Sequence, residues 1–240
     1  MKILEFDEID STNLETKRMA EGGDFGPLWV TAKRQTGGKG RRGREWVSET
    51  GNLFCTGLFP HVGTPASAAR LSFAAALAVH DTVSYFRQDA ETKIKWPNDV
   101  LMNGAKISGI LLESGTTNGQ LWVAVGIGVN LVSAPTSTPY QTTYLHDQLA
   151  PKLRLNLSSF KIQLFARFEF WLKNYNQNGF EPLRTAWLER AQGMGGPVTA
   201  RLPNKTIEGT AIGMDADGAL ELKTNAGEII KIHAGDVFFS

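Results

Sequence analysis

The amino-acid sequence predicts an α+β fold in two parts. The first is a domain with a mixed or antiparallel sheet packed with helices, and the second is a small β-barrel of about fifty residues. Apolar β-rich runs separated by short turns occupy residues 92–131, and helical periodicity flanks them on both sides. After residue 196 the composition changes to short alternating strands broken by Pro-Asn, Asp-Ala-Asp-Gly and Asn-Ala-Gly turns.

The first helix is predicted over residues 10–23 (DSTNLETKRMAEGG). Thr12 and Glu15 match a capping box at its start, and two consecutive glycines end it at residue 22. Two strands are predicted next, LWVTA at residues 28–32 and NLFCTGLF at residues 52–59.

A long alanine-rich helix is predicted from Thr64 to Arg87, with Thr64 as its N-cap and Pro65 in its first turn. The central β-rich runs follow at residues 92–96, 106–115 and 120–131. We place turns between these runs at residues 97–105 and 116–119.

Two further helices are predicted over residues 158–179 and 181–193. In the first, large apolar residues recur every three or four positions, at Phe160, Leu164, Phe168, Trp171 and Tyr175. The segment GMGGP, which begins at residue 193, is typical of a linker. Strands are expected after it at residues 198–202, 207–214, 219–224 and 228–234. We therefore divide the chain into a domain of residues 1–192 and a small domain of residues 193–240.

Composition limits the function classes. The 240 residues carry 25 basic and 24 acidic side chains, a formal charge of +1, so the chain as a whole does not resemble a nucleic-acid or membrane-surface binder. Cys55 is the single cysteine, which excludes an internal disulfide, and it is expected to be buried in a strand. No apolar run is long enough for a signal peptide or a membrane span, so we expect a cytoplasmic protein without a membrane partner.

The segment QTGGKGRRGREW, which begins at Gln35, places four glycines and four cations within twelve residues. Glycine allows backbone N–H groups to approach a ligand closely, and the cations favour an anion, either a nucleotide phosphate or a nucleic-acid backbone. Three of the cations are Arg41, Arg42 and Arg44, and we expect two of these to face a ligand. A solvated mobile loop is the alternative.

The common phosphate-binding loops do not fit this segment. Gly38, Gly40 and Gly43 match G-x-G-x-x-G, but the chain runs on into another strand where a dinucleotide fold needs a helix. A Walker A loop needs Ser or Thr directly after Lys39, and a kinase loop needs Val two residues after its last glycine.

Four more segments stand in order around this loop: Ser-Thr-Asn at residues 11–13, KWPND at 95–99, KISGIL at 106–111 and GIGVN at 126–130. Together the five segments resemble the biotin–protein ligases, also called biotin–[acetyl-CoA-carboxylase] ligases. The resemblance covers about residues 8–132, and the tail from Gly195 resembles the small SH3-like C-terminal domain of that family. It implies a catalytic domain with a fold like that of class II aminoacyl-tRNA synthetases.

The resemblance also implies a two-step reaction. The carboxylate of biotin attacks the α-phosphorus of ATP, in the presence of Mg²⁺, and gives biotinyl-5′-AMP and pyrophosphate. A lysine of a biotin carboxyl carrier protein, such as an acetyl-CoA carboxylase subunit, then takes the biotinyl group and releases AMP. Both steps concentrate negative charge, which explains the cations of the loop.

The residue roles follow from the same resemblance. Ser11, Thr12, Asn13 and Gln35 are expected to bind the ureido group of biotin, although Ser-Thr-Asn is also an ordinary helix start. Lys106 and Arg41 are the expected catalytic residues, with Lys106 joining the biotin carboxylate to the α-phosphate. Lysine before an apolar strand can equally be a surface residue at a sheet edge. The remaining biotin-binding residues are Lys39, Gly40, Arg41, Lys106 and Gly109.

For the nucleotide, the resemblance implies Arg41, Arg44, Trp46, Lys106 and Asn130, with Trp46 stacking on adenine. A tryptophan in this position can otherwise belong to the core. Supporting roles fall to Lys95, Asn98 and Asp99, and Asp99 is expected to orient Lys106 or a Mg²⁺-bound water. No metal ligand is assigned.

Lys39 and Gly37 stand where the family more often has Arg and Ala, and a lysine keeps the charge but loses the bidentate geometry of arginine. Ser11 comes so early in the chain that no helix-turn-helix domain is expected before it, which predicts a ligase of the monofunctional type without specific DNA binding. A homodimer is left open. Two alternatives are kept: a lipoate or octanoate ligase or transferase of the same fold, and a nucleic-acid-binding module.

Overall fold

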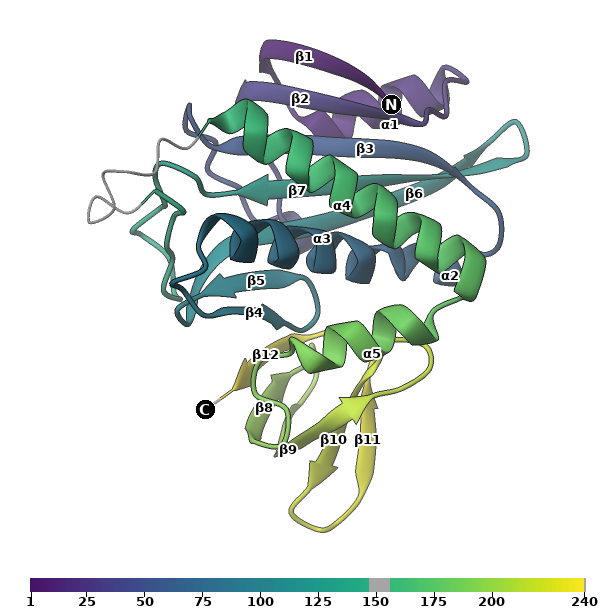
Figure 1. Cartoon of the computed structure of the whole chain (residues 1–240). Coiled ribbons are helices and arrows are strands. Elements are labelled where there is room, and N and C mark those ends of the chain that lie inside the picture. The colour runs from purple at the N-terminus through teal and green to yellow at the C-terminus, as the bar shows by residue number, and fades with distance from the viewer. Residues whose placement is uncertain (147–155, 240) are drawn as a thin grey trace.

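The computed structural model describes residues 1–146 and 156–239 of the chain. Two β-sheets dominate the structure, and in Figure 1 the larger sheet lies above the smaller one. Within the described ranges, no helix is at once long enough and apolar enough to cross a membrane.

The larger sheet has seven strands in the order β1-β2-β3-β7-β6-β5-β4. β1 and β2 are parallel and the other described neighbours are antiparallel, so the sheet is mixed, as predicted. Its strands are β1 (Lys2–Ile9), β2 (Leu28–Gln35), β3 (Leu53–His61), β4 (Thr92–Lys95), β5 (Asp99–Met102), β6 (Ala105–Thr117) and β7 (Gln120–Val129).

The alternation within β7 explains how one face of this sheet is packed and the other is left open. Successive side chains of a strand point to opposite faces. Val123, Val125 and Ile127 point into the main hydrophobic core. Gly126 and Gly128 point to the other face, where they add no bulk, and Gly128 pairs with Gly109 of β6. The middle of the sheet therefore has an apolar side and a side with room for a ligand.

Helices cover both faces of the larger sheet. α2 (Pro65–Ala69), α3 (Leu71–Phe86) and α4 (Leu157–Asn178) lie over the apolar face (Figure 1). α1 (Thr12–Glu21) lies on the opposite face, where Ala20 packs in a smaller apolar cluster with Val30 and Leu58. α1 covers only part of that face, beside the glycines of β7.

The smaller sheet has five antiparallel strands in the order β11-β10-β9-β8-β12. Its strands are β8 (Pro197–Arg201), β9 (Thr206–Met214), β10 (Leu220–Thr224), β11 (Ile229–Ile232) and β12 (Asp236–Phe239). α5 (Glu181–Glu189) precedes it and lies beside it in Figure 1.

Hydrogen bonds join the smaller sheet to the rest of the structure. The indole Nε1 of Trp96 donates to the carbonyl of Gly218 at 3.0 Å, and Nε of Arg184 in α5 donates to the carbonyl of Met214 at 2.7 Å. The segment after α5 also pairs with β4, since the N–H of Ile94 donates to the carbonyl of Arg190 at 2.9 Å. These contacts hold the end of the chain against the β4 edge of the larger sheet.

Most of the predicted elements are confirmed, including the buried strand that contains Cys55. Three strands were not predicted. β1 carries several exposed acidic residues, β5 is only four residues long within a segment interpreted as a turn, and β12 follows the last predicted strand closely. Short strands and edge strands lack the long alternation on which the prediction depends.

Two details of the predicted helices were wrong. The helix expected from Thr64 to Arg87 is interrupted at Arg70, whose side chain pairs with Asp217 and lies over the ring of Phe180. The N-cap of this segment at Thr64 is confirmed, because its hydroxyl accepts from the N–H of Ser67.

The capping box of α1 was the second error. Ser11, and not Thr12, is the N-cap, and its side chain makes no capping hydrogen bond. The Thr12 hydroxyl donates instead to Gln35 of β2, so a tertiary contact replaces the local one.

Candidate active site

A cavity of about 570 Å³ lies on the α1 side of the larger sheet and reaches the smaller sheet. Glycines make the space. A methyl group on Gly126 would stand 2.1 Å from Oδ1 of Asn13, and one on Gly128 would stand 2.5 Å from the indole of Trp46. Since non-bonded carbon and oxygen atoms do not approach this closely, glycine is required at both positions for these side chains to lie as they do.

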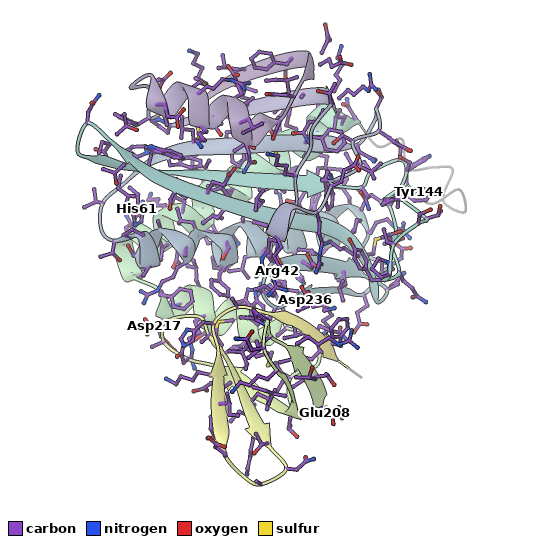
Figure 2. All side chains as sticks on the ribbon, turned by 180° about the vertical axis from the view of Figure 1, so that it is seen from behind. Arg42, His61, Tyr144, Glu208, Asp217 and Asp236 are labelled. Atoms are coloured by element: carbon purple, nitrogen blue, oxygen red, sulfur yellow. The ribbon has the colours of Figure 1, made fainter. Side chains whose placement is uncertain are left out.

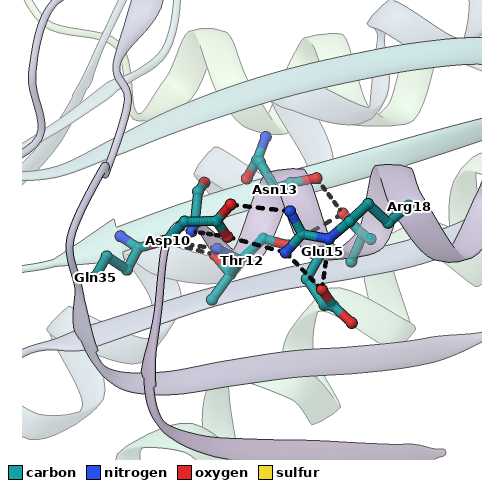
Figure 3. Close-up of polar contacts among 8 residues, drawn as sticks. Asp10, Thr12, Asn13, Glu15, Arg18 and Gln35 are labelled. Carbon is teal, nitrogen blue, oxygen red and sulfur yellow. Dashed lines mark hydrogen bonds and ion pairs between the residues drawn. The ribbon is translucent and has the colours of Figure 1, made fainter.

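The inner end of the cavity, where α1 begins and β2 ends, is polar. Ser11, Thr12, Asn13 and Gln35 all line it, as the sequence predicted. Both the backbone N–H and the hydroxyl of Thr12 donate to Oε1 of Gln35, at 2.8 and 3.1 Å (Figure 3). These bonds connect the start of α1 to the end of β2 and fix the Gln35 amide at the cavity wall.

Two residues that the sequence did not single out hold Asn13. Its Nδ2 donates to Oε2 of Glu113 at 2.8 Å, and its Oδ1 accepts from the hydroxyl of Thr56 at 2.7 Å. Thr56 is fully buried in β3 and Asn13 itself is only 7 % exposed. The Asn13 amide therefore has one fixed orientation. A polar residue within the apolar run NLFCTGLF was the one signal in the sequence for Thr56.

Lys106 lies in the middle of the cavity among an acid and two aromatic rings. Its Nζ is 2.7 Å from Oδ1 of Asp99, which is one of the two roles that the resemblance implied for this aspartate. The same Nζ lies 5.7 Å from the ring centre of Trp46 and 5.2 Å from that of Tyr140, both within cation–π range. The ion pair is mostly buried, with side-chain exposures of 16 % and 24 %, so the Lys106 ammonium is held in place.

The three arginines of the glycine-rich loop have different partners. Nη1 of Arg41 donates to Oδ1 of Asn98 at 3.1 Å, whereas Arg42 and Arg44 both bind Oδ2 of Asp236, at 3.0 and 2.6 Å. Figure 2 labels Arg42 and Asp236, which lie next to each other between the two sheets. Arg41 and Arg44 line the cavity and Arg42 does not, in agreement with the expectation that two of the three face it.

Burial, together with the neighbouring charge of Arg42, lowers the pKa of Arg41. A guanidinium stays charged in proteins all the same, so Arg41 brings a desolvated positive charge to the cavity. The loop contains a single 3-10 turn (Arg41–Gly43) and continues to β3, so no helix opens within it. This agrees with the argument against a dinucleotide fold.

Most other predicted residues line the same cavity. They are Lys39, Gly40, Trp46, Lys95, Asn98, Asp99, Lys106 and Gly109. Asn130 is the exception, because it is buried outside the cavity wall, where its Nδ2 donates to the carbonyl of Thr143 at 3.1 Å. Its predicted contact with the nucleotide stays a prediction.

The sequence analysis missed the cavity residues of two segments. Tyr140 comes from the loop after β7, and the smaller sheet contributes Arg201, Asp236 and Phe238. No motif marks these positions. Within the described ranges, no group of three or more His, Cys, Asp and Glu side chains is placed to hold a metal ion.

The arrangement suits a ligand with a neutral polar group at one end and an acid or phosphate next to it. Hydrogen-bonding groups lie at the inner end, and Lys106 and Arg41 supply cations beyond them. Trp46 and Tyr140 offer aromatic surfaces on which a base can stack. Fixed cations in a partly closed cavity stabilise charge that develops on a phosphoryl or carboxyl group.

Two parts of the chain match known protein families. Residues 6–130 match the biotin/lipoate A/B protein ligase family, and residues 194–240 match the biotin protein ligase C terminal domain. The chain therefore belongs to the biotin/lipoate A/B protein ligase family, which is the class that the resemblance predicted.

Two relatives are similar to this chain over nearly its whole length. The chain is 43 % identical over 235 residues to the biotin–[acetyl-CoA-carboxylase] ligase of Paracoccus denitrificans, a match that covers 96 % of this chain and 97 % of that protein. It is 31 % identical over 239 residues to the bifunctional ligase/repressor of Bacillus subtilis, covering 98 % of this chain and 73 % of that one.

The fold also matches solved structures. The structure of the biotin protein ligase from Aquifex aeolicus in complex with biotin and ATP aligns with a TM-score of 0.81 and 24 % identity, over 100 % of this chain and 99 % of that one. This likeness confirms the predicted α+β fold with its mixed larger sheet.

Proposed function

We propose that this chain is a biotin–protein ligase, which activates biotin with ATP and transfers it to a lysine of a carrier protein. One observation carries the proposal. A single cavity brings together the Ser11–Asn13 segment, the ion pair of Lys106 with Asp99, and two arginines of the glycine-rich loop. The relative of 43 % identity is a biotin–[acetyl-CoA-carboxylase] ligase, which favours biotin over lipoate as the acid.

In the first step the inner end of the cavity holds biotin. Thr12, Asn13 and Gln35 present hydrogen-bonding groups to the ureido ring, and the carboxylate points toward Lys106. A carboxylate oxygen forms a bond to the α-phosphorus of ATP, and the bond from that phosphorus to the bridging oxygen breaks, so that pyrophosphate leaves. The Lys106 ammonium offsets the negative charge of the two anions as they approach.

In the second step the loop that carries Arg41 covers the mixed anhydride and limits the access of water. The unprotonated amine of the carrier lysine bonds to the acyl carbon. The bond from that carbon to the phosphate oxygen then breaks, AMP leaves, and the nitrogen loses one proton to solvent as it becomes an amide. Arg41 and Lys106 remain near the phosphate, where they stabilise the departing charge.

The described residues fit ATP that arrives as its Mg²⁺ complex. Mg²⁺ in such sites is usually held by one or two carboxylates together with substrate phosphates and water. Asp99 and Asp236 line the cavity and are the carboxylates nearest to its cations. When bound, the ion neutralises phosphate charge, and these two side chains are the candidates to support its water shell.

Several finer parts of the proposal rest on the family resemblance. We propose a catalytic domain of residues 1–192 with a fold like that of class II aminoacyl-tRNA synthetases. The smaller domain of residues 193–240, which contains the five-stranded sheet, is then an SH3-like barrel, and the match of residues 194–240 supports this. We also propose a biotin carboxyl carrier protein as the partner, a cytoplasmic location and no specific DNA binding. The choice between a monomer and a homodimer is left open.

The experiment that tests the function is biotin-dependent exchange of labelled pyrophosphate into ATP, with Mg²⁺, run beside lipoate and octanoate. Exchange with biotin alone is the expected result. Exchange with lipoate or octanoate in place of biotin would contradict the proposal and reassign the Ser11–Asn13 pocket. If none of the three acids supports exchange, the chain does not carry out the proposed adenylating step.

A further inference from the structure

The amide of Asn13, at the inner end of the cavity, has different partners at its nitrogen and at its oxygen. Its Nδ2 donates to Oε2 of Glu113 at 2.8 Å and lies 3.4 Å from the carbonyl oxygen of Leu111. Its Oδ1 accepts from the hydroxyl of Thr56 at 2.7 Å. The nitrogen therefore faces β6 and the oxygen faces β3. Turning the amide over would exchange a donor for an acceptor at each of these places.

The Thr56 hydroxyl does not select between the two orientations of this amide. A hydroxyl can donate one hydrogen bond and can also accept. Oγ1 of Thr56 lies 2.8 Å from Oγ1 of Thr12, to which it can donate instead. It can then accept from the amide nitrogen of Asn13 as readily as it now donates to the oxygen.

The Glu113 carboxylate does select one orientation. An ionised carboxylate only accepts hydrogen bonds, so an amide oxygen turned toward it would be repelled. The Leu111 carbonyl also only accepts, but at 3.4 Å it is the weaker contact. Hydrogen bonds to an ionised acceptor are roughly twice as strong as neutral ones. Glu113 therefore decides which end of the Asn13 amide faces β6.

This orientation leaves one hydrogen-bond acceptor available to a ligand. A methyl group on Gly126 would stand 2.1 Å from Oδ1 of Asn13, so this oxygen lies directly over a glycine that lines the cavity. An amide oxygen has two lone pairs, and Thr56 uses one of them on Asn13. Oε1 of Gln35, which lines the same end, already accepts two hydrogen bonds from Thr12. Oδ1 of Asn13 is therefore the amide oxygen that can still accept from a ligand N–H.

We propose that Glu113 is a positioning residue that makes Asn13 an acceptor and thereby selects an acid whose far end carries an N–H donor. This inference rests on the proposed function and names the group that is recognised: one ureido N–H of biotin donates to Oδ1 of Asn13. The dithiolane ring of lipoate and the alkyl end of octanoate have no donor. They would leave this buried oxygen without a second partner, and an unpaired polar group in the site is what rejects a wrong substrate.

The first part of the test exchanges donor and acceptor within the pair. Asn13→Asp places a second carboxylate against Glu113, and adding Glu113→Gln restores a donor opposite the new carboxylate. Both exchanges keep the number of side-chain heavy atoms. The control is Glu208→Gln, because Glu208 is exposed on the smaller sheet and does not line the cavity (Figure 2).

Thermal unfolding is measured by calorimetry without ligand. The unfolding midpoint of Asn13→Asp should fall by about 5 °C or more, because two carboxylates then face each other in a buried place. The double variant should recover most of this loss, and Glu208→Gln should unfold as the unchanged protein does.

The second part of the test measures ligand selection by calorimetry. The ligands are biotin and its two cyclic carbamate analogues, in each of which an oxygen replaces one ureido N–H. The unchanged protein should bind biotin about tenfold or more tightly than one of these analogues, because in that complex two oxygens face each other. In Glu113→Gln the Asn13 amide can adopt both orientations. The preference should then fall to about twofold or less, and the affinity for biotin should fall about twofold. The double variant keeps an oxygen at this place and should keep the preference.

Several results would overturn the inference. If the double variant does not recover the unfolding midpoint, residues 13 and 113 are not a donor–acceptor pair. If Glu113→Gln keeps the full preference for biotin, the carboxylate does not set the orientation. If the unchanged protein binds biotin and both analogues equally, Oδ1 of Asn13 accepts no ureido N–H. An equal loss of preference in Glu208→Gln would show a general effect of charge.

The two parts of the test also separate this inference from the proposed function. The unfolding midpoints need no ligand. If the double variant recovers its midpoint but the unchanged protein does not bind biotin, the orienting role of Glu113 is supported and the proposed function is contradicted.

Discussion

Gly126 provides the most direct test of the inner end of the cavity. In Gly126→Ala the new methyl group would stand 2.1 Å from Oδ1, 2.9 Å from Cγ and 3.0 Å from Nδ2 of Asn13. A Cβ atom essentially never lies this close to another heavy atom, so the Asn13 side chain must retreat by roughly 1 Å. Asn13 is almost fully buried, and its retreat breaks the contacts that orient it.

The cost follows from those contacts. The bond from Asn13 to the Glu113 carboxylate is charge-assisted and contributes about 1.5–3 kcal/mol, and the bond from Thr56 contributes about 0.5–1.5 kcal/mol. Loss of both lowers the free energy of unfolding by about 2–4.5 kcal/mol. For a chain of this length the midpoint of thermal unfolding falls by something on the order of 10 °C.

The functional effect should be confined to one substrate. Because Asn13 is expected to contact the ureido group, the KM for biotin should rise about tenfold or more, while the KM for ATP stays within about twofold. Pyrophosphate exchange measures both constants, and calorimetry measures the unfolding midpoint. Gly213→Ala is the matched control, since a methyl group there meets nothing closer than 3.6 Å.

Two outcomes would refute this reasoning. If Gly126→Ala unfolds at the same temperature as the unchanged protein, Asn13 can move without losing its hydrogen bonds. If the variant unfolds at a lower temperature but keeps the KM for biotin of the unchanged protein, the packing argument is confirmed. Asn13 then does not contact biotin.

Three further predictions concern charged residues. Lys106→Ala should lower pyrophosphate exchange roughly a hundredfold or more without changing the circular dichroism spectrum, and normal exchange would exclude Lys106 from the mechanism. Arg41→Gly should release biotinyl-AMP, measured as biotin label on an unrelated protein such as serum albumin, and a variant that retains the intermediate as the parent does would contradict the clamp. The hydrogen bonds from Arg18 lower the pKa of Asp10 to about 2, from 3.8 (Figure 3). The stability from the ionised Asp10 is therefore complete above pH 3.8 and is lost as the pH falls toward 2. Asp10→Asn should cost about 1 kcal/mol or less at pH 7, since the pair is half exposed, and urea unfolding should show the difference disappearing near pH 2. A difference that does not depend on pH would contradict the assignment.

The sequence analysis succeeded best where local spacing carries the information. The apolar run at residues 120–131 predicted a strand, which is β7 in the structure, and its valines and glycines point to opposite faces of the sheet. The Gly- and Arg-rich loop and the segments around Ser11 and Lys106 were expected to gather, and they line one cavity. The prediction of a capping box at Thr12 was wrong because the Thr12 hydroxyl donates its hydrogen bond to Oε1 of Gln35 in β2.

The sequence by itself determined the larger elements, because periodicity depends on neighbours within a few residues. The class of protein and the expected chemistry of the cavity came from the resemblance of five segments, between residues 11 and 130, to a known family. The tertiary structure alone decided the contacts between distant segments. It brought Asp236 to Arg42 and Arg44, Tyr140 to Lys106, and Phe238 to Lys95. Such pairs leave no local pattern, since the packing of the two sheets, and not the spacing along the chain, sets which side chains meet.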